Sequence, residues 1–102
     1  MRRLSDYADR DIRLTDERLE HIEQRSEMKG QIDRIEETLQ KPDDIRKSEQ
    51  DEDVFLYYRQ YDETRVTEKY LLVVVKIGVD SPFVIIAFYT DRIKSGTVVD
   101  VE

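Results

Sequence analysis

Residues 70–89 read YLLVVVKIGVDSPFVIIAFY, and this stretch decides the fold. Two nearly unbroken runs of β-branched and aromatic residues, Tyr70–Ile77 and Phe83–Tyr89, are joined by Gly78–Pro82, which predicts a β-hairpin. Continuous apolar character is typical of central strands that are covered on both faces. One helical layer covers only one face, so we expect Gly96–Val101 or a partner subunit to cover the other.

Between Pro42 and this hairpin, the side chains follow the two-residue period of β-strands. Ile45–Ser48 predicts a short edge strand, and Val54–Tyr61 predicts a longer one. One side of the longer strand is expected to present Phe55, Tyr57, Arg59 and Tyr61. Together with the hairpin, these segments predict a four-stranded antiparallel sheet, connected as a meander.

The segment before these strands has the periodicity of two helices. Thr15 is suited to cap a helix that begins at Asp16, in which Leu19 and Ile22 mark the buried stripe. Gly30 is expected to break or bend the helical run, and Pro42 to end it. The sequence therefore predicts an α+β fold in which an N-terminal helix pair packs on one face of the four-stranded antiparallel sheet.

The length of 102 residues is that of one domain. The first 13 residues are rich in Arg and Asp and show no clear periodicity. We therefore expect a flexible arm at 1–13 and a single α+β domain at 14–102.

The composition excludes several classes of site and location. The chain has no cysteine, one histidine and three glycines, so neither a zinc site nor a glycine-rich phosphate loop is expected, and we predict no metal and no cofactor. The segment Met1–Leu14 lacks the apolar run of a signal peptide, and Tyr70–Val75 is too short to span a membrane. We expect a cytoplasmic protein without a membrane partner. Its net charge of −7 counts against nucleic-acid binding.

The only histidine lies in a basic strip of the first predicted helix. At about 100° per residue, Arg18, His21 and Arg25 fall on one flank of that helix. One interpretation is a general acid or base beside guanidinium groups that bind phosphate. The alternative is a solvated face whose charges pair at i, i+4, for example Glu17 with His21.

The sheet contains a second group of polar residues, Arg59, Lys69, Lys76 and Thr90. Side chains at strand ends can line a cleft that holds a phosphate, where lysine acts as a point charge and arginine as a bidentate fork. The simpler interpretation is that these residues mark the points at which strands meet water. The six tyrosines and three phenylalanines are likewise open to two interpretations, a stacking platform for single-stranded nucleic acid or ordinary sheet residues.

Four segments resemble a family of small prokaryotic and phage proteins. They read LTDERLEHI at 14–22, YYR at 57–59, EKYLLVVVK at 68–76 and FVIIAFYTDRIKSG at 83–96. In this order they are similar to members of the barnase/EndoU/colicin/RelE-like (BECR-type) nuclease superfamily. The resemblance extends from residue 12 to about residue 100.

The resemblance implies a toxin-like ribonuclease that cleaves RNA without a metal. In such enzymes the 2′-hydroxyl of the RNA is the nucleophile, and the protein supplies a proton acceptor, a proton donor and positive charge. The resemblance implies that His21 is the acid or base, that Lys69 stabilises the phosphate, and that Thr90 orients the phosphate or the histidine. The same resemblance implies that Arg18, Arg59 and Lys76 bind flanking phosphates.

One position departs from the pattern of this family. Relatives often continue with Arg-His-Pro-Glu where this chain has Arg25-Ser26-Glu27, so a second histidine is missing. A lysine or water must then be the other proton-transfer group. Two hypotheses follow, an endoribonuclease with an RNA substrate and an antitoxin partner, or a non-enzymatic interaction domain that binds a partner or itself through the sheet.

Overall fold

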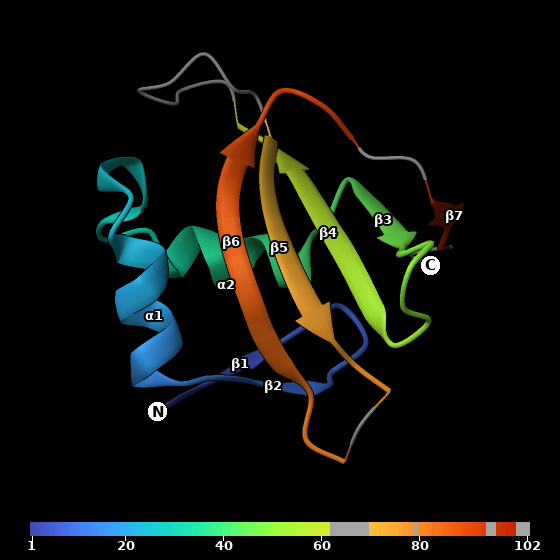
Figure 1. The fold of residues 1–102 in the computed structure, drawn as a ribbon, viewed down its shortest axis with the longest axis horizontal. Helices are drawn as coiled ribbons and strands as arrows, with labels where there is room; N and C mark the ends of the chain where they lie inside the picture. The colour runs from blue at the N-terminus through green and yellow to red at the C-terminus, as the bar shows by residue number, and fades with distance from the viewer. Residues whose placement is uncertain (62–69, 79, 94–95, 100–102) are drawn as a thin grey trace.

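The computed structural model describes residues 1–61, 70–78, 80–93 and 96–99. Within them, two α-helices lie against a single seven-stranded sheet (Figure 1). The helical elements are α1 (Asp16–Glu23), the 3₁₀ turn η1 (Ser26–Met28) and α2 (Ile32–Gln40). The strands are β1 (Arg2–Ser5), β2 (Asp11–Leu14), β3 (Asp44–Lys47), β4 (Val54–Gln60), β5 (Tyr70–Lys76), β6 (Phe83–Thr90) and β7 (Thr97–Val98).

The four-stranded antiparallel meander predicted from the sequence is wrong. The four expected strands are present as β3, β4, β5 and β6, each paired antiparallel with the next. Two further elements extend this sheet, and its order is β1-β2-β6-β5-β4-β3-β7. The hairpin of β1 and β2 joins β6 through a parallel pairing of Arg13 with Phe83, so the sheet is mixed.

Residues 1–13, which we expected to form a flexible arm, instead provide β1 and most of β2. Leu4, Ile12 and Leu14 are buried in the main core, although they have charged neighbours in Arg3, Asp11 and Arg13. A four-residue strand with one or two buried positions gives too short an alternation to stand out in a sequence. This is why the hairpin was not predicted.

The predicted helix pair is confirmed. The Oγ1 atom of Thr15 accepts a hydrogen bond from the backbone N–H of Arg18 at 3.2 Å, which caps α1. Gly30 separates the two helices and has a φ of +72°, a left-handed conformation that glycine adopts readily. Ile22 from α1 and Ile35 and Leu39 from α2 reach the main core beneath one face of the sheet.

The opposite face of the sheet carries a smaller core. Leu56, Tyr58 and Leu72 are buried there, and Phe88 and Ile93 pack against them. The segment expected to cover this face takes another position, because β7 pairs with β3 and forms the edge of the sheet; residues 100 and 101 lie outside the described residues. Among the described residues, only Met1 and Val98 are large exposed hydrophobic side chains, so this face does not require a partner subunit.

A buried carboxylate ties the N-terminal hairpin to the central sheet. One oxygen of Asp6 accepts hydrogen bonds from the Tyr57 hydroxyl at 2.7 Å and from Arg10 Nε at 2.8 Å. Its other oxygen accepts from the backbone N–H groups of Ala8 and Arg10. Burial, together with the hydrogen bond to Asp6, raises the pKa of Tyr57, so the phenol keeps the proton that it donates. The turn between β1 and β2 is thereby fixed to β4.

We expect Asp6→Ala to lower the free energy of unfolding by about 3 kcal/mol, because it leaves the buried Tyr57 hydroxyl and the Arg10 guanidinium without their acceptor. Urea denaturation followed by circular dichroism measures this loss. The matched control is Asp11→Ala, which removes an exposed ion pair with Arg3 on the same hairpin and should cost less than about 1 kcal/mol. Equal losses in the two variants would contradict the role given to Asp6.

Candidate functional site

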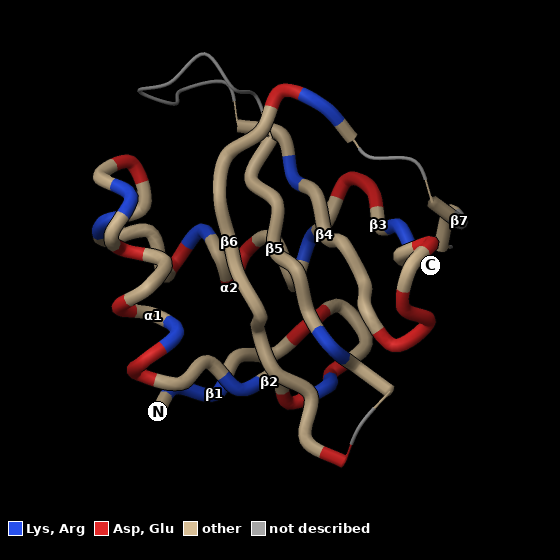
Figure 2. Tube along the Cα trace, in the orientation of Figure 1, with Lys and Arg blue, Asp and Glu red and all other residues tan. Residues whose placement is uncertain are grey.

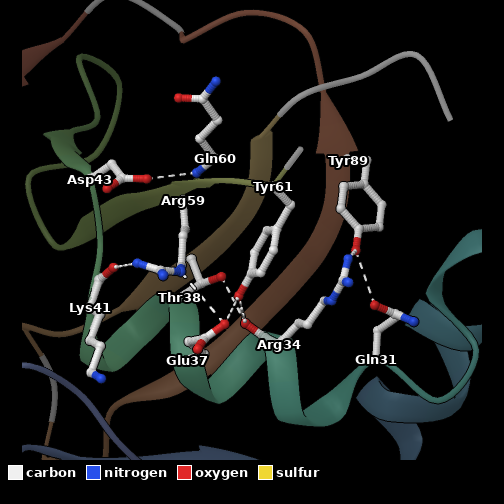
Figure 3. Close-up of polar contacts among 10 residues, drawn as sticks. All are labelled: Gln31, Arg34, Glu37, Thr38, Lys41, Asp43, Arg59, Gln60, Tyr61 and Tyr89. Carbon is white, nitrogen blue, oxygen red and sulfur yellow. Dashed lines mark hydrogen bonds and ion pairs between the residues drawn. The ribbon is translucent and has the colours of Figure 1, made fainter. Parts of the chain in front are cut away.

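Three strands bring polar side chains to one end of the sheet. Tyr70, the first residue of β5, pairs with Gln60 at the end of β4 and with Thr90 at the end of β6. Helix α2 crosses the sheet here and adds its own polar residues (Figure 3). We call this region the strand-end site and define it by Arg34, Arg59, Tyr61 and Tyr89, which lie on the helix-facing side of the sheet.

Arg34 of α2 is the central cation of the strand-end site. Its Nη1 atom donates a hydrogen bond to the Tyr89 hydroxyl at 3.2 Å, and its guanidinium lies 4.6 Å from the centre of the Tyr61 ring. The Tyr89 hydroxyl in turn donates to Oε1 of Gln31 at 3.0 Å (Figure 3). The hydrogen bond with Tyr89 raises the pKa of Arg34, so the group stays charged. Among the described residues Arg34 forms no ion pair with a carboxylate, which leaves N–H donors for an anion.

Tyr61 and Glu37 form a second hydrogen-bonded pair beside Arg34. The Tyr61 hydroxyl donates to Glu37 Oε1 at 2.5 Å. Burial is the main cause that raises the pKa of Tyr61 to about 12, and the bond to Glu37 adds to it. The same hydrogen bond is the main cause that lowers the pKa of Glu37. At neutral pH Tyr61 therefore stays protonated and Glu37 stays ionised, so neither is suited to exchange a proton with a substrate.

Arg59, a predicted phosphate ligand, lies in the strand-end site. It donates through Nη1 to the backbone carbonyl of Lys41 at 2.7 Å, and its guanidinium lies 5.6 Å from the Tyr61 ring centre. Its Nε atom is buried without a hydrogen-bond partner, and the nearest Glu37 carboxylate oxygen is 3.6 Å away, too far for a good hydrogen bond. Arg59 is thus held in place by a backbone hydrogen bond, but its positive charge is only partly compensated by Glu37.

Thr90, a predicted catalytic residue, lies at this end of the sheet, at the last position of β6, but its side chain is on the face opposite Tyr89 and Arg34, because neighbouring residues of a strand point to opposite faces. Its hydroxyl is 3.3 Å from both the backbone N–H and the carbonyl of Arg92. These local contacts fix the turn after β6 and orient the hydroxyl. Lys69 lies outside the described residues; Tyr70, which follows it in sequence, is at this end of the sheet.

His21 and Arg18 lie on the exposed surface of α1. They line a shallow depression of about 270 Å³ with Glu17, Glu20 and Gln24, and the side chain of His21 forms no hydrogen bond or ion pair with another described residue. Arg25, the third member of the predicted basic strip, lies 5.3 Å from the ring centre of Phe88. Phe88 and Thr90 are two residues apart on β6 and share the face of the smaller core, so the strip meets β6 close to its end but on the face opposite Tyr89 and Arg34.

Lys76 is separated from the other predicted residues. It is the last residue of β5, six residues after Tyr70, and a strand rises about 3.3 Å per residue, which places it roughly 20 Å from the strand-end site. There it forms an ion pair with Asp51 at 3.3 Å. Lys76 therefore cannot bind the same phosphate as Arg34 or Arg59.

The sequence prediction missed Arg34 and the positions of the two tyrosines around it. Arg34 is next to Ile35 on a helix that was predicted from the spacing of its apolar residues. That spacing does not distinguish Arg34 from the other charged residues on the helix surface. Among residues 1–61, 70–78, 80–93 and 96–99, no group of three or more His, Cys, Asp or Glu side chains gathers as a metal ion would require. No helix in the same part of the chain is long and apolar enough to cross a membrane.

Comparison with known proteins identifies a nuclease domain. A family model described as phage-Barnase-EndoU-ColicinE5/D-RelE like nuclease2 (PBECR2) matches residues 2–98, nearly the whole chain. The resemblance inferred from four short segments is thereby confirmed. No curated protein and no solved structure matches this chain.

The Tyr61–Glu37 pair predicts a pH-dependent contribution to stability. Because the pKa of Glu37 is lowered in the folded state, its stabilising effect is present above the pKa of the unfolded chain and is lost as pH falls through the lowered value. Tyr61→Phe should therefore lower stability by about 1 kcal/mol at pH 7, a modest value because the Glu37 side chain is 44% exposed. The difference from wild type should shrink as the pH falls below the pKa of the unfolded chain and through the lowered value. Thermal melting from pH 3 to 7 measures it, and a gap of constant size would contradict the pairing.

Proposed function

We propose that this chain, which belongs to the phage-Barnase-EndoU-ColicinE5/D-RelE like nuclease2 family, is a nuclease that cleaves RNA at the strand-end site. The observation that carries the proposal is the state of Arg34. It is a permanent cation that two tyrosines hold across the ends of β4 and β6, and it forms no ion pair with a carboxylate among the described residues. A preformed positive charge of this kind is what phosphoryl transfer requires.

The reaction that we propose needs no metal. The 2′-hydroxyl oxygen attacks the adjacent phosphorus while a base takes its proton. The bond from phosphorus to the 5′-oxygen then breaks, an acid gives that oxygen a proton, and a 2′,3′-cyclic phosphate remains. Arg34 stabilises the additional negative charge on the phosphorane, and Arg59 holds a neighbouring phosphate.

His21 is the proposed proton-transfer group. Its ring is exposed and is not engaged by other described residues, so it is free to meet an RNA strand that lies across the edge of β6. Arg25 supports this arrangement because it extends the basic strip as far as Phe88. Lys69 or water is the second proton-transfer group in this proposal, and Arg18 binds a flanking phosphate. The role of Thr90 stays a prediction of the resemblance, because its side chain is on the face opposite Arg34.

The biological setting stays a prediction from the family resemblance. Toxin-like action, an antitoxin partner, self-association and a cytoplasmic location belong to this prediction. The non-enzymatic alternative, binding through an apolar sheet face, has lost its main support, because the side chains at the centre of that face, Leu56, Tyr58 and Leu72, are buried.

The proposal is tested by incubating the purified full chain with single-stranded RNA in excess EDTA. We expect fragments that end in a 2′,3′-cyclic phosphate. Arg34→Ala should lower kcat/KM by about 10²–10³, the typical effect of removing one group that stabilises transition-state charge. Arg34→Lys should recover part of this loss because it keeps the charge but not the fork. His21→Ala should also lower kcat.

The matched control is Lys47→Ala, which removes a cation at the far edge of the sheet and should leave the rate unchanged. Absence of cyclic-phosphate ends from the wild-type reaction would overturn the proposed reaction. Full activity of Arg34→Ala would remove the strand-end site from it, and full activity of His21→Ala would remove the histidine.

A further inference from the structure

The end of the sheet opposite the strand-end site carries a row of cations that the proposed reaction does not use. The strand register places Arg3 opposite Arg13, Arg13 opposite Phe83, and Phe83 opposite Lys76. Four neighbouring strands, β1, β2, β6 and β5, thus contribute three cations and one aromatic ring to a single row. We call these four residues the cationic row.

The cationic row faces away from the helices. Leu4, Ile12, Leu14, Val75 and Val84 all lie in the main core, and each is next in sequence to a member of the row. Neighbouring residues of a strand point to opposite faces, so the four members of the row point outward. Figure 2 shows the basic positions of β1 and β2 gathered at this end of the sheet, with one on the adjacent end of β5.

The charges of the row are only weakly neutralised. Arg3 pairs with Asp11 and Lys76 pairs with Asp51, but these pairs are largely exposed and contribute little. Arg13 has no carboxylate partner among the described residues. Its Nη2 atom donates to the Ser81 carbonyl at 3.0 Å, and its Nε atom is buried without a hydrogen-bond partner.

Two further observations indicate an anionic ligand. Like charges directly opposite one another on paired strands are destabilising, yet Arg3 and Arg13 occupy such positions. Both also line a shallow depression of about 270 Å³, together with Arg10, Ser81 and Pro82 and with two carboxylates, Asp11 and Asp80. An anion in this depression would relieve the repulsion between the arginines.

We infer that the cationic row binds a segment of single-stranded RNA beyond the cleavage point. Arg3 and Arg13 bind one phosphate, Lys76 binds another, and a base stacks on Phe83 between them. Neighbouring strands lie about 4.8 Å apart, so Arg13 and Lys76 are roughly 10 Å from each other. The guanidinium of Arg13 is already 6.0 Å from the centre of the Phe83 ring. Cations that alternate with an aromatic ring are typical of surfaces that bind single strands.

This inference rests on the proposed function for the identity of the ligand. It also assigns a role to Lys76, which the strand-end site does not include. Phe83 is seven residues from Thr90 along β6, so the row lies roughly 23 Å along the strand from the end that holds the strand-end site. It is also on the opposite face of the sheet from Arg34, at the far side of the β6 edge. Only an RNA long enough to span that distance can contact both regions.

The experiment measures binding of fluorescent single-stranded RNA to the full chain by anisotropy, with oligonucleotides of four and of about fifteen nucleotides that carry 2′-O-methyl groups to prevent cleavage. Arg13→Gln should weaken binding of the long RNA on the order of tenfold and leave the short RNA unaffected. It should also reduce the slope of log Kd against log salt concentration by about 0.7, the value for one phosphate contact on a single strand. Phe83→Leu should weaken binding without changing that slope.

The matched control is Arg2→Gln, which removes the same charge from the neighbouring strand β1, one position away from Arg3 of the row. It should change neither the affinity for the long RNA nor the salt slope. Thermal melting of each variant shows whether the fold is retained, and Lys76→Gln provides a second test of the row if Arg13→Gln does not fold.

The outcomes separate the two proposals. If the long RNA binds Arg13→Gln and Lys76→Gln as tightly as wild type, the row is not an RNA site, whether or not the wild type cleaves RNA. If the row variants bind more weakly while unmodified RNA is not cleaved, the row stands and the proposed reaction fails. If wild type binds no RNA but binds a polyglutamate peptide that Arg13→Gln does not bind, the row is a site for an acidic protein and the inference is overturned.

Discussion

The antiparallel pairing of β5 with both β4 and β6 is the constraint on which the rest of the structure depends. Leu71, Val73 and Val75 bury one side of β5 against the helices, and a slip of one residue would move all three to the other face. The same register also decides which side chains meet at each end of the sheet. It sets Tyr70 between Gln60 and Thr90 at one end of the sheet and Lys76 between Val54 and Phe83 at the other. Both groups of cations are therefore positioned by the same apolar side chains.

The parts of the fold that could be predicted from the sequence are those with a long and regular pattern. Tyr70–Ile77 and Phe83–Tyr89 are continuous apolar runs, and Leu19, Ile22, Ile35 and Leu39 keep helical spacing, so the central strands and both helices were predicted. The parts that could not be predicted depend on contacts distant in sequence. The N-terminal hairpin is fixed by Asp6, whose partner Tyr57 is 51 residues away, and β7 has only two residues. Neither element has a periodic sequence pattern, so the sequence did not predict the number of strands in the sheet or its parallel pairing.

The candidate site shows the same division. Arg59 and Thr90 could be picked out because each is a polar residue near the end of an otherwise apolar strand, and the structure brings both to one end of the sheet. Lys76 satisfies the same criterion but lies at the opposite end, since a sequence pattern does not tell which strand ends meet. Arg34 satisfies no such criterion. Its importance comes from Tyr61 and Tyr89, which lie on either side of β5 and hold its guanidinium in a position that only the folded sheet defines.

The net charge of −7 argued against nucleic acid, and the structure shows why total charge is a poor guide for this chain. At physiological ionic strength the Debye length is about 8 Å, so a phosphate responds mainly to the charges that it touches. At the strand-end site the nearest carboxylate, Glu37, accepts a hydrogen bond from Tyr61, and this leaves Arg34 without an ion pair. In the cationic row the carboxylates form exposed pairs that a phosphate can displace. If the proposed function is right, the acidic surface elsewhere opposes non-specific attachment of RNA, and we expect binding at these two places, where cations are held close together by the register of the sheet.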